Sequence, residues 1–399
     1  MQRGGYMKCT WHLQVGGIVL VCVIAAAGAT SQPPAQVGGS GIPAFRVDPL
    51  WPKPLPSTTD ADGLVRQWVT GQVGASCIDS HDHIVTVNRG FLPGGLLAQE
   101  GTQSIPAPPV TLYDPAGNIV ESWGDATLTS AGAAAVLPHG IHGCFVDAQD
   151  NIWIAGNSDG VVQQWSHDGT TMLMQIGTKG VCDGLRTTRE APYPTCGEPG
   201  LNSSRTLLNA PADIAVDPHP DPVTGEPGSI YIADGYGNHR IVVFDRAGNY
   251  LRQWGSPGSG PGQFVEGGGG HPHCVALSND GFVYACDRGQ NRIQVFDREG
   301  NLQRILAIDP PGYMTATLRA TDIEFSRDAA QRFLYVVDLG SDRIWIAERE
   351  SGAIVGGVGR AGHMAGEFTF PHTVVVDSTG SLYVAETVGG RRNQKFVRE

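Results

Sequence analysis

The stretch GSIYIADGYGNHRIVVFDRAGN at residues 228–249 is closely matched by DGFVYACDRGQNRIQVFDREGN at residues 280–301. Each contains an apolar run with an aromatic residue, a polar turn, a further apolar run that begins near an arginine, and a Gly-Asn turn. A shorter apolar run, which ends at Asp217 or Ser278, precedes each of them. One such unit predicts a meander of about four short strands, which buries too little apolar surface to be stable alone.

The turn that follows the first strand of the unit recurs along the chain and allows the units to be counted. An Asp or Ser occupies it six times, at Asp79, Asp147, Asp217, Ser278, Ser326 and Asp377. Radial packing of these units predicts an all-β, six-bladed β-propeller, and no helical periodicity appears after the N-terminal segment. The last unit ends early, at residues 395–397, so we expect a strand around residues 45–47 to complete it and close the ring.

Two motifs within these units resemble a known repeat. GPGQF at residues 260–264 leads into a strand, and DGYGNHRI occupies residues 234–241. Both resemble NHL repeats, and the resemblance covers most of the chain from about residue 65 onward. Taken alone, this resemblance implies a fold and no activity.

The N-terminal segment has the features of an export signal. Arg3 and Lys8 precede an apolar run at residues 15–29, which ends in Ala-Gly-Ala. A positive start, a short apolar run and a small-residue cleavage site are typical of a secretory signal peptide, whereas an uncleaved anchor would need a longer apolar run. The predicted organisation is a signal peptide at 1–29, a flexible leader at 30–44 and a six-bladed NHL propeller at 45–399.

Composition limits the functional classes that fit. Of 399 residues, 41% are hydrophobic, which is enough for a sizeable core, and the formal net charge is −12. A charge of that sign argues against a nucleic-acid partner or an anionic membrane surface. No later segment approaches the roughly 18 apolar residues of a membrane span. We therefore predict a secreted or periplasmic protein with no integral span after signal cleavage, and we expect a monomer.

The cysteines agree with an oxidising compartment. Six of the eight lie beyond the signal segment, an even number that allows disulfides. Cys182 and Cys196 flank a polar insertion that contains proline, and we expect them to close it. Cys274 and Cys286 lie nearly opposite each other on a predicted hairpin and can pair, whereas the pairing of the remaining two stays open.

One position at the start of each first strand alternates in a regular way. Counted five residues before the turn Asp or Ser, it reads Gly74, His142, Ala212, His273, Thr321 and His372. First strands line the central channel of a propeller, so these positions form one ring whose alternate members converge on one point. Three imidazoles with an open position are the ligands of a catalytic zinc, and other divalent first-row metals also accept them. The small residues between the histidines leave room for a metal and a substrate.

A structural role is the alternative for each histidine taken singly. Histidine suits a strand-entry turn such as Pro272-His273 or Pro371-His372, where it can form purely local hydrogen bonds. His139 also follows a proline, but it lies eight residues before Asp147 rather than five, so the register favours His142. The strict alternation of the histidines favours metal binding over separate structural roles.

Residues just after each second strand should surround the histidine ring, because that strand ends where the first begins. They include Arg89, Tyr236 and Arg288, and the two arginines lie in blades three apart, so they face each other across the axis. Two guanidinium groups beside a cationic metal suit an anionic ligand, above all a carboxylate. The alternative is a scaffold role, with Arg288 paired to Asp287 or Glu386 and Tyr236 at a turn. The third-strand arginines are assigned to the scaffold, at Arg240, Arg292 and Arg343.

This constellation resembles peptidyl-α-hydroxyglycine α-amidating lyase, a family of six-bladed propellers with a three-histidine zinc site. The matching histidines are His142 in His-Gly-x-x-x-Asp, His273 in Pro-His-x-x-Ala-Leu and His372 in Pro-His. The resemblance implies cleavage of an N-(carboxy)hydroxymethyl amide into an amide and glyoxylate.

The same resemblance assigns roles to the other residues. The family's catalytic tyrosine matches Tyr236, and its two active-site arginines match Arg89 and Arg288. Two positions depart from the family, which has Met before the third Pro-His and Asp after it, where this chain has Phe370 and Thr373. That Asp supports a structural calcium in the family, so a calcium here stays open. The chain shows no monooxygenase domain that would make a hydroxyglycine, which leaves the physiological substrate open.

The mechanism expected from these residues is that of a metal-dependent carbon–nitrogen lyase. The carboxylate of a small amide or peptide substrate binds to Arg89 and Arg288, zinc acts as a Lewis acid on the hydroxyl, and Tyr236 accepts its proton. The C–N bond then breaks, and a protonated group returns a proton to the departing amide. Two rival classes are a non-catalytic NHL propeller that binds an exported partner and a lactonase-type hydrolase, which would need carboxylates and amides around calcium.

Overall fold

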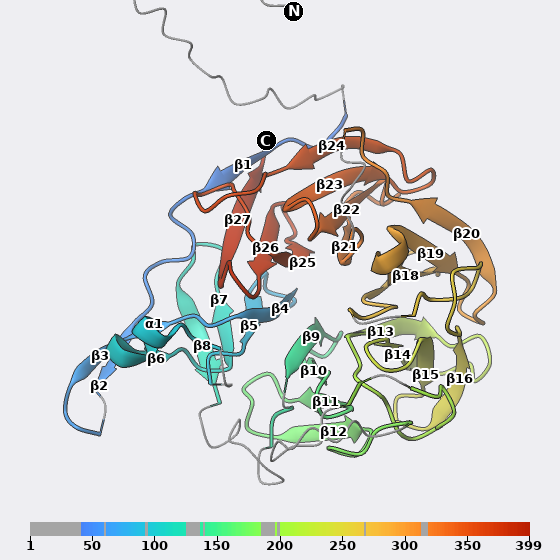
Figure 1. Ribbon diagram of the computed structural model, residues 1–399, viewed down its shortest axis with the longest axis horizontal. Helices are drawn as coiled ribbons and strands as arrows, with labels where there is room; N and C mark the ends of the chain where they lie inside the picture. The colour runs from blue at the N-terminus through green and yellow to red at the C-terminus, as the bar shows by residue number, and fades with distance from the viewer. Residues whose placement is uncertain are drawn as a thin grey trace, which may run out of the picture. The chain divides into compact units, whose positions relative to one another are not determined.

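The computed structural model describes most of the chain beyond its N-terminal segment (Figure 1). The described ranges are 41–59, 61–91, 95–124, 136–138, 140–184, 196–197, 200–266, 269–312 and 318–399. The predicted signal peptide and all but residues 41–44 of the predicted leader lie outside them. The structure is 45% strand and 3% helix, which agrees with the all-β prediction.

Within these ranges, six four-stranded antiparallel sheets form the blades. The first contains β4 (Val73–Ile78), β5 (Ile84–Asn88), β7 (Val110–Tyr113) and β8 (Ile119–Trp123). The second contains β9 (Ile141–Val146), β10 (Ile152–Gly156), β11 (Val161–Trp165) and β12 (Met172–Ile176). The third contains β13 (Asp213–Pro220), β14 (Pro227–Asp234), β15 (Arg240–Phe244) and β16 (Tyr250–Trp254).

The remaining blades follow the same plan. The fourth contains β17 (Val275–Leu277), β18 (Val283–Asp287), β19 (Arg292–Phe296) and β20 (Leu302–Ala307). The fifth contains β21 (Asp322–Phe325), β22 (Phe333–Asp338), β23 (Arg343–Glu348) and β24 (Ile354–Val358). The sixth contains β25 (Pro371–Val376), β26 (Leu382–Glu386), β27 (Arg392–Arg398) and β1 (Phe45–Asp48).

The Asp or Ser at the first turn of a blade ends the first strand by binding backbone N–H groups with its side chain. Oδ1 of Asp147 accepts hydrogen bonds from the N–H groups of Gln149 and Asn151, both at 3.0 Å. The hydroxyl of Ser278 accepts the N–H of Phe282 at 3.0 Å. Short polar side chains of this kind replace strand partners of the backbone, which is why they mark turns in the sequence.

The N-terminal strand completes the last blade, as predicted. β1 pairs antiparallel with β27, so that Phe45 lies opposite Arg398 and Val47 lies opposite Phe396. Figure 1 shows blue β1 beside red β27. Strands from both ends of the propeller therefore share one sheet, in which β1 is the outer edge strand, and this pairing closes the ring.

The inner strands are joined across blade boundaries by side chains, because no sheet continues from one blade to the next. β4 contacts β9 and β25, and β13 contacts β9 and β17. Oδ2 of Asp213 accepts the N–H of Val275 at 3.0 Å, which links β13 to β17. The hydroxyl of Thr373 accepts the N–H of Ser76 at 3.0 Å, which links β25 to β4. Thr373, which replaces the Asp of the resembling family, thus holds two neighbouring blades together.

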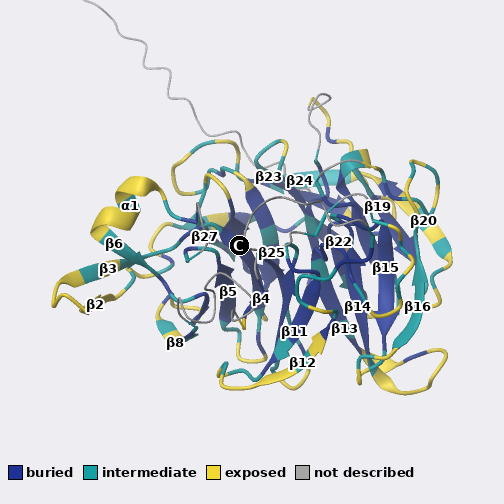
Figure 2. Ribbon diagram, turned by 60° about the horizontal axis from the view of Figure 1, so that its bottom comes forward, coloured by how far each residue is buried: buried dark blue, intermediate teal, exposed yellow. Residues whose placement is uncertain are grey.

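Apolar side chains fill the spaces between neighbouring blades, and the buried strands of Figure 2 coincide with these clusters. One cluster joins the fifth and sixth blades and contains Tyr335, Ile346 and Val374. Phe45 of β1 belongs to it, with its ring 5.5 Å from that of Tyr335 in an edge-on arrangement. The core is therefore distributed around the ring, and each blade is stabilised by its neighbours.

The third-strand arginines belong to the scaffold, as predicted. Nε of Arg240 donates to Asp234 at 2.9 Å, and the Arg343 guanidinium lies 4.7 Å from the Trp345 ring centroid. Nε of Arg292 donates to Asp287 at 2.7 Å. The contacts of Arg240 and Arg292 tie the end of a second strand to the start of the third, whereas that of Arg343 lies within its own strand.

A small three-stranded sheet and two short helices were not predicted. The sheet contains β2 (Ser57–Thr59), β3 (Val65–Val69) and β6 (Ser104–Pro106), and the helices are α1 (Ala98–Gln103) and the 3₁₀ turn η1 (Arg288–Gln290). The sequence shows no helical periodicity at α1, because a six-residue helix without buried residues has no apolar periodicity to detect. Neither described helix is long and apolar enough to cross a membrane.

Three disulfides are present among the described residues. Cys182–Cys196 and Cys274–Cys286 form as the sequence suggested. The third, Cys77–Cys144, joins β4 to β9 across a blade boundary, and the two cysteines are 67 positions apart in the sequence. Its pairing was open at the sequence level because it depends on which inner strands become neighbours.

Candidate metal centre

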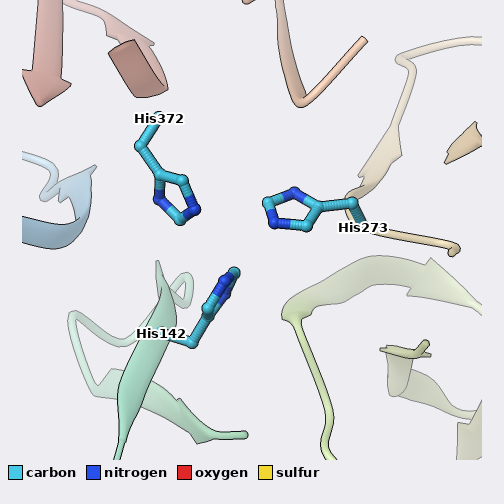
Figure 3. A group of neighbouring side chains, drawn as sticks. All are labelled: His142, His273 and His372. Carbon is cyan, nitrogen blue, oxygen red and sulfur yellow. The ribbon is translucent and has the colours of Figure 1, made fainter. Parts of the chain in front are cut away.

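Three buried histidines from alternate blades meet near the axis (Figure 3). His142 lies on β9 and His372 on β25, whereas His273 lies just ahead of β17. One nitrogen from each ring lies within 4.8 Å of the other two. The ring centroids are between 4.7 and 5.1 Å apart. The alternation in the sequence thus becomes a cluster that could hold one metal ion.

The backbone of the intervening ring positions orients each imidazole. Nδ1 of His142 donates to the carbonyl oxygen of Ala212 at 2.7 Å. In the same way, Nδ1 of His273 donates to Thr321 and Nδ1 of His372 donates to Gly74, both at 2.6 Å. A carbonyl oxygen only accepts, so each Nδ1 carries the proton and each Nε2 keeps its lone pair. The sequence suggested only that these small residues leave space, but their carbonyl groups also select the tautomer that a metal requires.

Burial keeps the three imidazoles neutral. Burial lowers the pKa of His142 well below its ordinary value, and the neighbouring His372 lowers it further. Burial, and then the charge of Arg288, does the same to the pKa of His273. Burial and the charge of Arg89 lower the pKa of His372 to about 3. At neutral pH no proton competes for the Nε2 lone pairs.

Tyr236 reaches the same point from the turn after β14. Its hydroxyl lies 2.9 Å from Nε2 of His142 and 3.0 Å from Nε2 of His273. Nη2 of Arg288 donates to the same hydroxyl at 3.1 Å, and this guanidinium lies 5.5 Å from the tyrosine ring centroid. The phenolic oxygen is therefore within hydrogen-bond distance of two candidate ligands and one cationic donor.

Two arginines approach the histidines from the ends of β5 and β18. Nε of Arg89 donates to the carbonyl oxygen of Ile141, the residue before His142. Nη2 of Arg89 and Nε of Arg288 are buried and have no hydrogen-bond partner among the residues that the structure describes. Burial lowers the pKa of both guanidinium groups, but arginine remains charged at physiological pH. Buried cationic donors without partners are costly, so this arrangement is suited to an anionic ligand.

Arg288 does not pair with Asp287 or Glu386, as the scaffold alternative would require. The carboxylate of Asp287 pairs with Arg292 at 2.7 Å, and that of Glu386 pairs with Arg392 at 2.6 Å. Both carboxylates thus serve other arginines. The partner of Arg288 is Tyr236, which brings these two predicted site residues together.

His271, which the sequence reasoning missed, links two of the turns that carry site residues. Its backbone N–H donates to the carbonyl of Gly235 at 2.7 Å, and its Nδ1 accepts the N–H of Gly289 at 3.1 Å. Gly235 precedes Tyr236, and Gly289 follows Arg288. The His-Pro-His run was the available signal. His139, the alternative to His142, lies outside the described residues.

Beyond the histidines, the inner strands surround a cavity of about 460 Å³. Its lining includes Asp213, Asp322 and Glu324, and none of the six predicted site residues. Burial, followed by the charge of Glu324, raises the pKa of Asp213 to about 7. Burial and the charge of Asp213 raise the pKa of Asp322 well above its ordinary value. The candidate centre and this acidic cavity are therefore separate parts of the channel.

Sequence comparisons agree with the repeat. The family model "NHL repeat" matches residues 270–296, which include His273 and Arg288. Human NHL repeat-containing protein 3 is 24% identical over 369 residues, or 88% of this chain and 84% of that protein. Mouse peptidyl-glycine alpha-amidating monooxygenase is 27% identical over 243 residues, or 57% of this chain and 20% of that protein. A probable peptidyl-alpha-hydroxyglycine alpha-amidating lyase of Caenorhabditis elegans is 27% identical over 158 residues, or 39% of this chain and 36% of that protein.

A solved structure of a streptogramin B lyase superimposes with a TM-score of 0.51 and 11% identity, over 89% of this chain and 98% of that chain. The likeness shows the fold alone. The chain is a β-propeller with an NHL repeat. The all-β propeller prediction is thereby confirmed, as is the similarity to NHL-repeat and amidating proteins. Identities of 24% to 28% to the curated relatives leave the activity to be proposed from the site.

Proposed function

We propose that this protein is a zinc-dependent lyase that cleaves an α-hydroxyglycine-type amide into an amide and glyoxylate. The observation that carries the proposal is the convergence of three histidines of fixed tautomer, one tyrosine hydroxyl and two arginines, each of which has one buried nitrogen without a hydrogen-bond partner among the described residues. Another divalent first-row metal could take the place of zinc on the same nitrogens.

The donor set fits a metal. His142, His273 and His372 each have Nδ1 held by a carbonyl oxygen, so that Nε2 is the free donor. Three neutral imidazoles with one position left over are typical of catalytic zinc. When bound, the ion would supply Lewis acidity, which makes a nearby hydroxyl group more acidic.

Arg89 and Arg288 would bind the substrate carboxylate. Within the described part of the chain, each has one buried nitrogen without a hydrogen-bond partner, and both lie around the histidine cluster. Their planar donors match a carboxylate, and binding it would remove the cost of two buried, incompletely paired cations. The carboxylate would orient the neighbouring carbinol carbon toward Tyr236.

Tyr236, acting in its phenolate form, would accept the proton of the substrate hydroxyl and become the neutral phenol. As that O–H bond breaks, its electron pair forms the C=O bond of glyoxylate, and the electrons of the C–N bond leave with the amide nitrogen. The nitrogen takes up one proton, which the Tyr236 hydroxyl can return, so the reaction needs no oxidant and no water. Arg288 donates to the phenolic oxygen at 3.1 Å and would stabilise the phenolate before it accepts the proton and after it returns it.

The comparisons agree with the proposed activity but do not establish it. A probable peptidyl-alpha-hydroxyglycine alpha-amidating lyase is among the relatives, at 27% identity over 39% of this chain. The three disulfides are compatible with an exported protein, and we propose a secreted or periplasmic location. The substrate would then be a small carboxylate-bearing amide or a peptide outside the cytoplasm.

The test combines metal analysis with product formation. Purified protein should contain one zinc or related ion per chain and should convert N-benzoyl-α-hydroxyglycine to benzamide and glyoxylate. A chelator should abolish the reaction, and zinc should restore it. His273→Ala should lose both metal and activity, whereas His363→Ala, which changes an exposed loop histidine, should lose neither.

The outcomes separate the rival classes. Metal-free protein with no glyoxylate release from any α-hydroxyglycine amide would reject the lyase and favour a propeller that only binds a partner. If the protein contains one metal ion per chain but does not release glyoxylate, the metal centre would be confirmed and the α-hydroxyglycine amides would be rejected as substrates.

A further inference from the structure

The turn that carries Tyr236 is held by the carbonyl groups of residues 209 and 210. The N–H of Tyr236 donates to Ala210 at 3.1 Å, and the N–H groups of Gly237 and Asn238 donate to Asn209 at 3.0 and 3.2 Å. Ala210 has a φ of 59°, a left-handed conformation that a residue with a Cβ keeps only when its surroundings enforce it. The position of the tyrosine hydroxyl therefore depends on where residues 209–210 are held.

Asn209 is completely buried, and its side chain uses both its donor and its acceptor atoms. Nδ2 donates to the carbonyl oxygens of Asp183 at 2.7 Å and Gly197 at 3.0 Å, and Oδ1 accepts the N–H of Gly197 at 2.8 Å. A Cβ at Gly237 would overlap the Asn209 amide, so this side chain also packs directly under the tyrosine turn. The amide cannot shift without breaking several buried hydrogen bonds.

The two residues that hold Asn209 each follow a cysteine of the same disulfide. Cys182 precedes Asp183, Cys196 precedes Gly197, and the Cα atoms of the two cysteines are 5.6 Å apart. The N–H of Cys196 donates to Ser158 at 2.8 Å, which anchors this end to the second blade. The disulfide thus fixes the spacing of both anchors of the Asn209 amide.

We propose that Asn209, held by the Cys182–Cys196 disulfide, is a positioning residue for Tyr236. Its side-chain amide is hydrogen-bonded to Asp183 and Gly197, which each follow a cysteine of the disulfide. Its backbone carbonyl accepts the N–H groups of Gly237 and Asn238 and so holds the turn that carries Tyr236. The device keeps the Tyr236 hydroxyl at hydrogen-bond distance from His142 and His273. The kinetic test of this inference rests on the proposed lyase function, whereas its structural test does not.

The first variant is Asn209→Asp, which keeps the size of the side chain but replaces its N–H donors with an oxygen that faces two carbonyl groups. We expect kcat to fall about tenfold or more, because a small displacement of a catalytic group has a large effect on rate. Metal content should stay unchanged, since Nδ1 of each histidine is held by a backbone carbonyl group. KM should change less than kcat, since Arg89 is held by the carbonyl group of Ile141. Asn249→Asp is the matched control, because this exposed-turn asparagine of the same blade donates to Asp245 at 2.9 Å. Its kcat should equal that of the unmodified protein.

A double-mutant cycle separates positioning from general damage. If Asn209 acts through Tyr236, Asn209→Asp should cause no further loss of kcat in a Tyr236→Phe background. An equal loss in both backgrounds would overturn the proposal.

Amide hydrogen exchange tests the link without any assay of activity. In Asn209→Asp, and in the second variant Cys182→Ala/Cys196→Ala, the amides of residues 236–238 should exchange faster, but not in Asn249→Asp. If the two test variants exchange faster at residues 236–238 but the unmodified protein has no lyase activity, the proposed function is rejected. The conclusion that Asn209 and the disulfide position the tyrosine turn would still stand. Unchanged exchange in both test variants would overturn the device, whatever the activity.

Discussion

Each histidine of the centre uses its two nitrogens for different purposes. Nδ1 is bound to a carbonyl oxygen of the next ring position, and Nε2 faces the other histidines. The acceptors are a glycine, an alanine and a threonine, whose own side chains play no part in the bond. A substitution at these three positions would therefore disturb the site through size, while the orientation of the imidazoles is set by the backbone.

At the same scale, Tyr236→Phe removes only the hydroxyl that lies 2.9 and 3.0 Å from two histidine nitrogens. We expect kcat for N-benzoyl-α-hydroxyglycine to fall by about 100-fold or more, the usual contribution of a positioned acid or base. Metal content should not change. Tyr250→Phe, on an outer strand, is the control, and equal activity of the two variants would contradict the role of Tyr236.

At the scale of elements, the blades show how a strand acquires stability from its neighbours. β1 is only four residues long, yet it pairs along its whole length with β27 and places Phe45 in the cluster between the fifth and sixth blades. An isolated strand of this length would not be stable. Closure of the ring therefore depends on one aromatic anchor as well as on the strand pairing.

Phe45→Ala tests that anchor. Phe45 is 4% exposed, and loss of a buried phenylalanine side chain lowers the free energy of unfolding by about 3 kcal/mol or more. Denaturant unfolding should detect this change, whereas Leu50→Ala, at a residue that is 71% exposed, should have almost no effect. A Phe45→Ala protein as stable as the Leu50→Ala protein would show that β1 is dispensable for closure.

Asp221, a buried residue of the loop between β13 and β14, forms an ion pair with Arg252 of β16 that should make stability depend on pH. Asp221 pairs with Arg252 at 2.7 Å, and despite the cost of burial, hydrogen bonds from Arg252, Ser229 and the loop backbone lower its pKa to about 2. A carboxyl with a lowered folded pKa contributes stability above its unfolded pKa, and this contribution is lost as the pH falls toward 2. The amount is roughly 2 kcal/mol.

Asp221→Asn should therefore be less stable than the unmodified protein at pH 7, and the difference should shrink as the pH falls from about 5 to about 2. Urea unfolding at a series of pH values measures it. A difference that stays constant or grows at low pH would show that ionisation of Asp221 does not contribute to stability.

At the scale of the whole molecule, disulfides that cross blade boundaries restrict the unfolded chain most. Cys77–Cys144 joins the inner strands of two blades over 67 residues, whereas Cys182–Cys196 spans 14. Chain entropy then predicts a stabilisation of about 4 kcal/mol for the first and about 3 kcal/mol for the second. The Cys77→Ala/Cys144→Ala protein should unfold at lower denaturant concentration than Cys182→Ala/Cys196→Ala, and the reverse order would contradict the entropic account.

Local patterns in the sequence predicted the architecture and the residues of the candidate centre. The turn Asp and Ser residues mark the units because each binds its own neighbouring backbone, as Asp147 does. Counting back from those turns placed His142, His273 and His372 on one ring, and counting past the second strands added Arg89, Tyr236 and Arg288. The structure brings these side chains close together because every repeat has the same geometry, so that equal offsets become equal positions in space, while their catalytic roles stay a prediction.

Contacts between distant parts of the chain were decided only by the tertiary structure. The acceptor of His372 is Gly74, 298 positions away, and the partner of Cys77 is Cys144 in the next blade. Asn209, His271 and the small sheet of β2, β3 and β6 also left no periodic signal. The sequence by itself determined the strands and turns of each blade and the side chains at each position, because those features depend on neighbours along the chain. Closure of the ring determined which backbone groups those side chains meet, because only closure brings the two ends of the propeller and adjacent inner strands together.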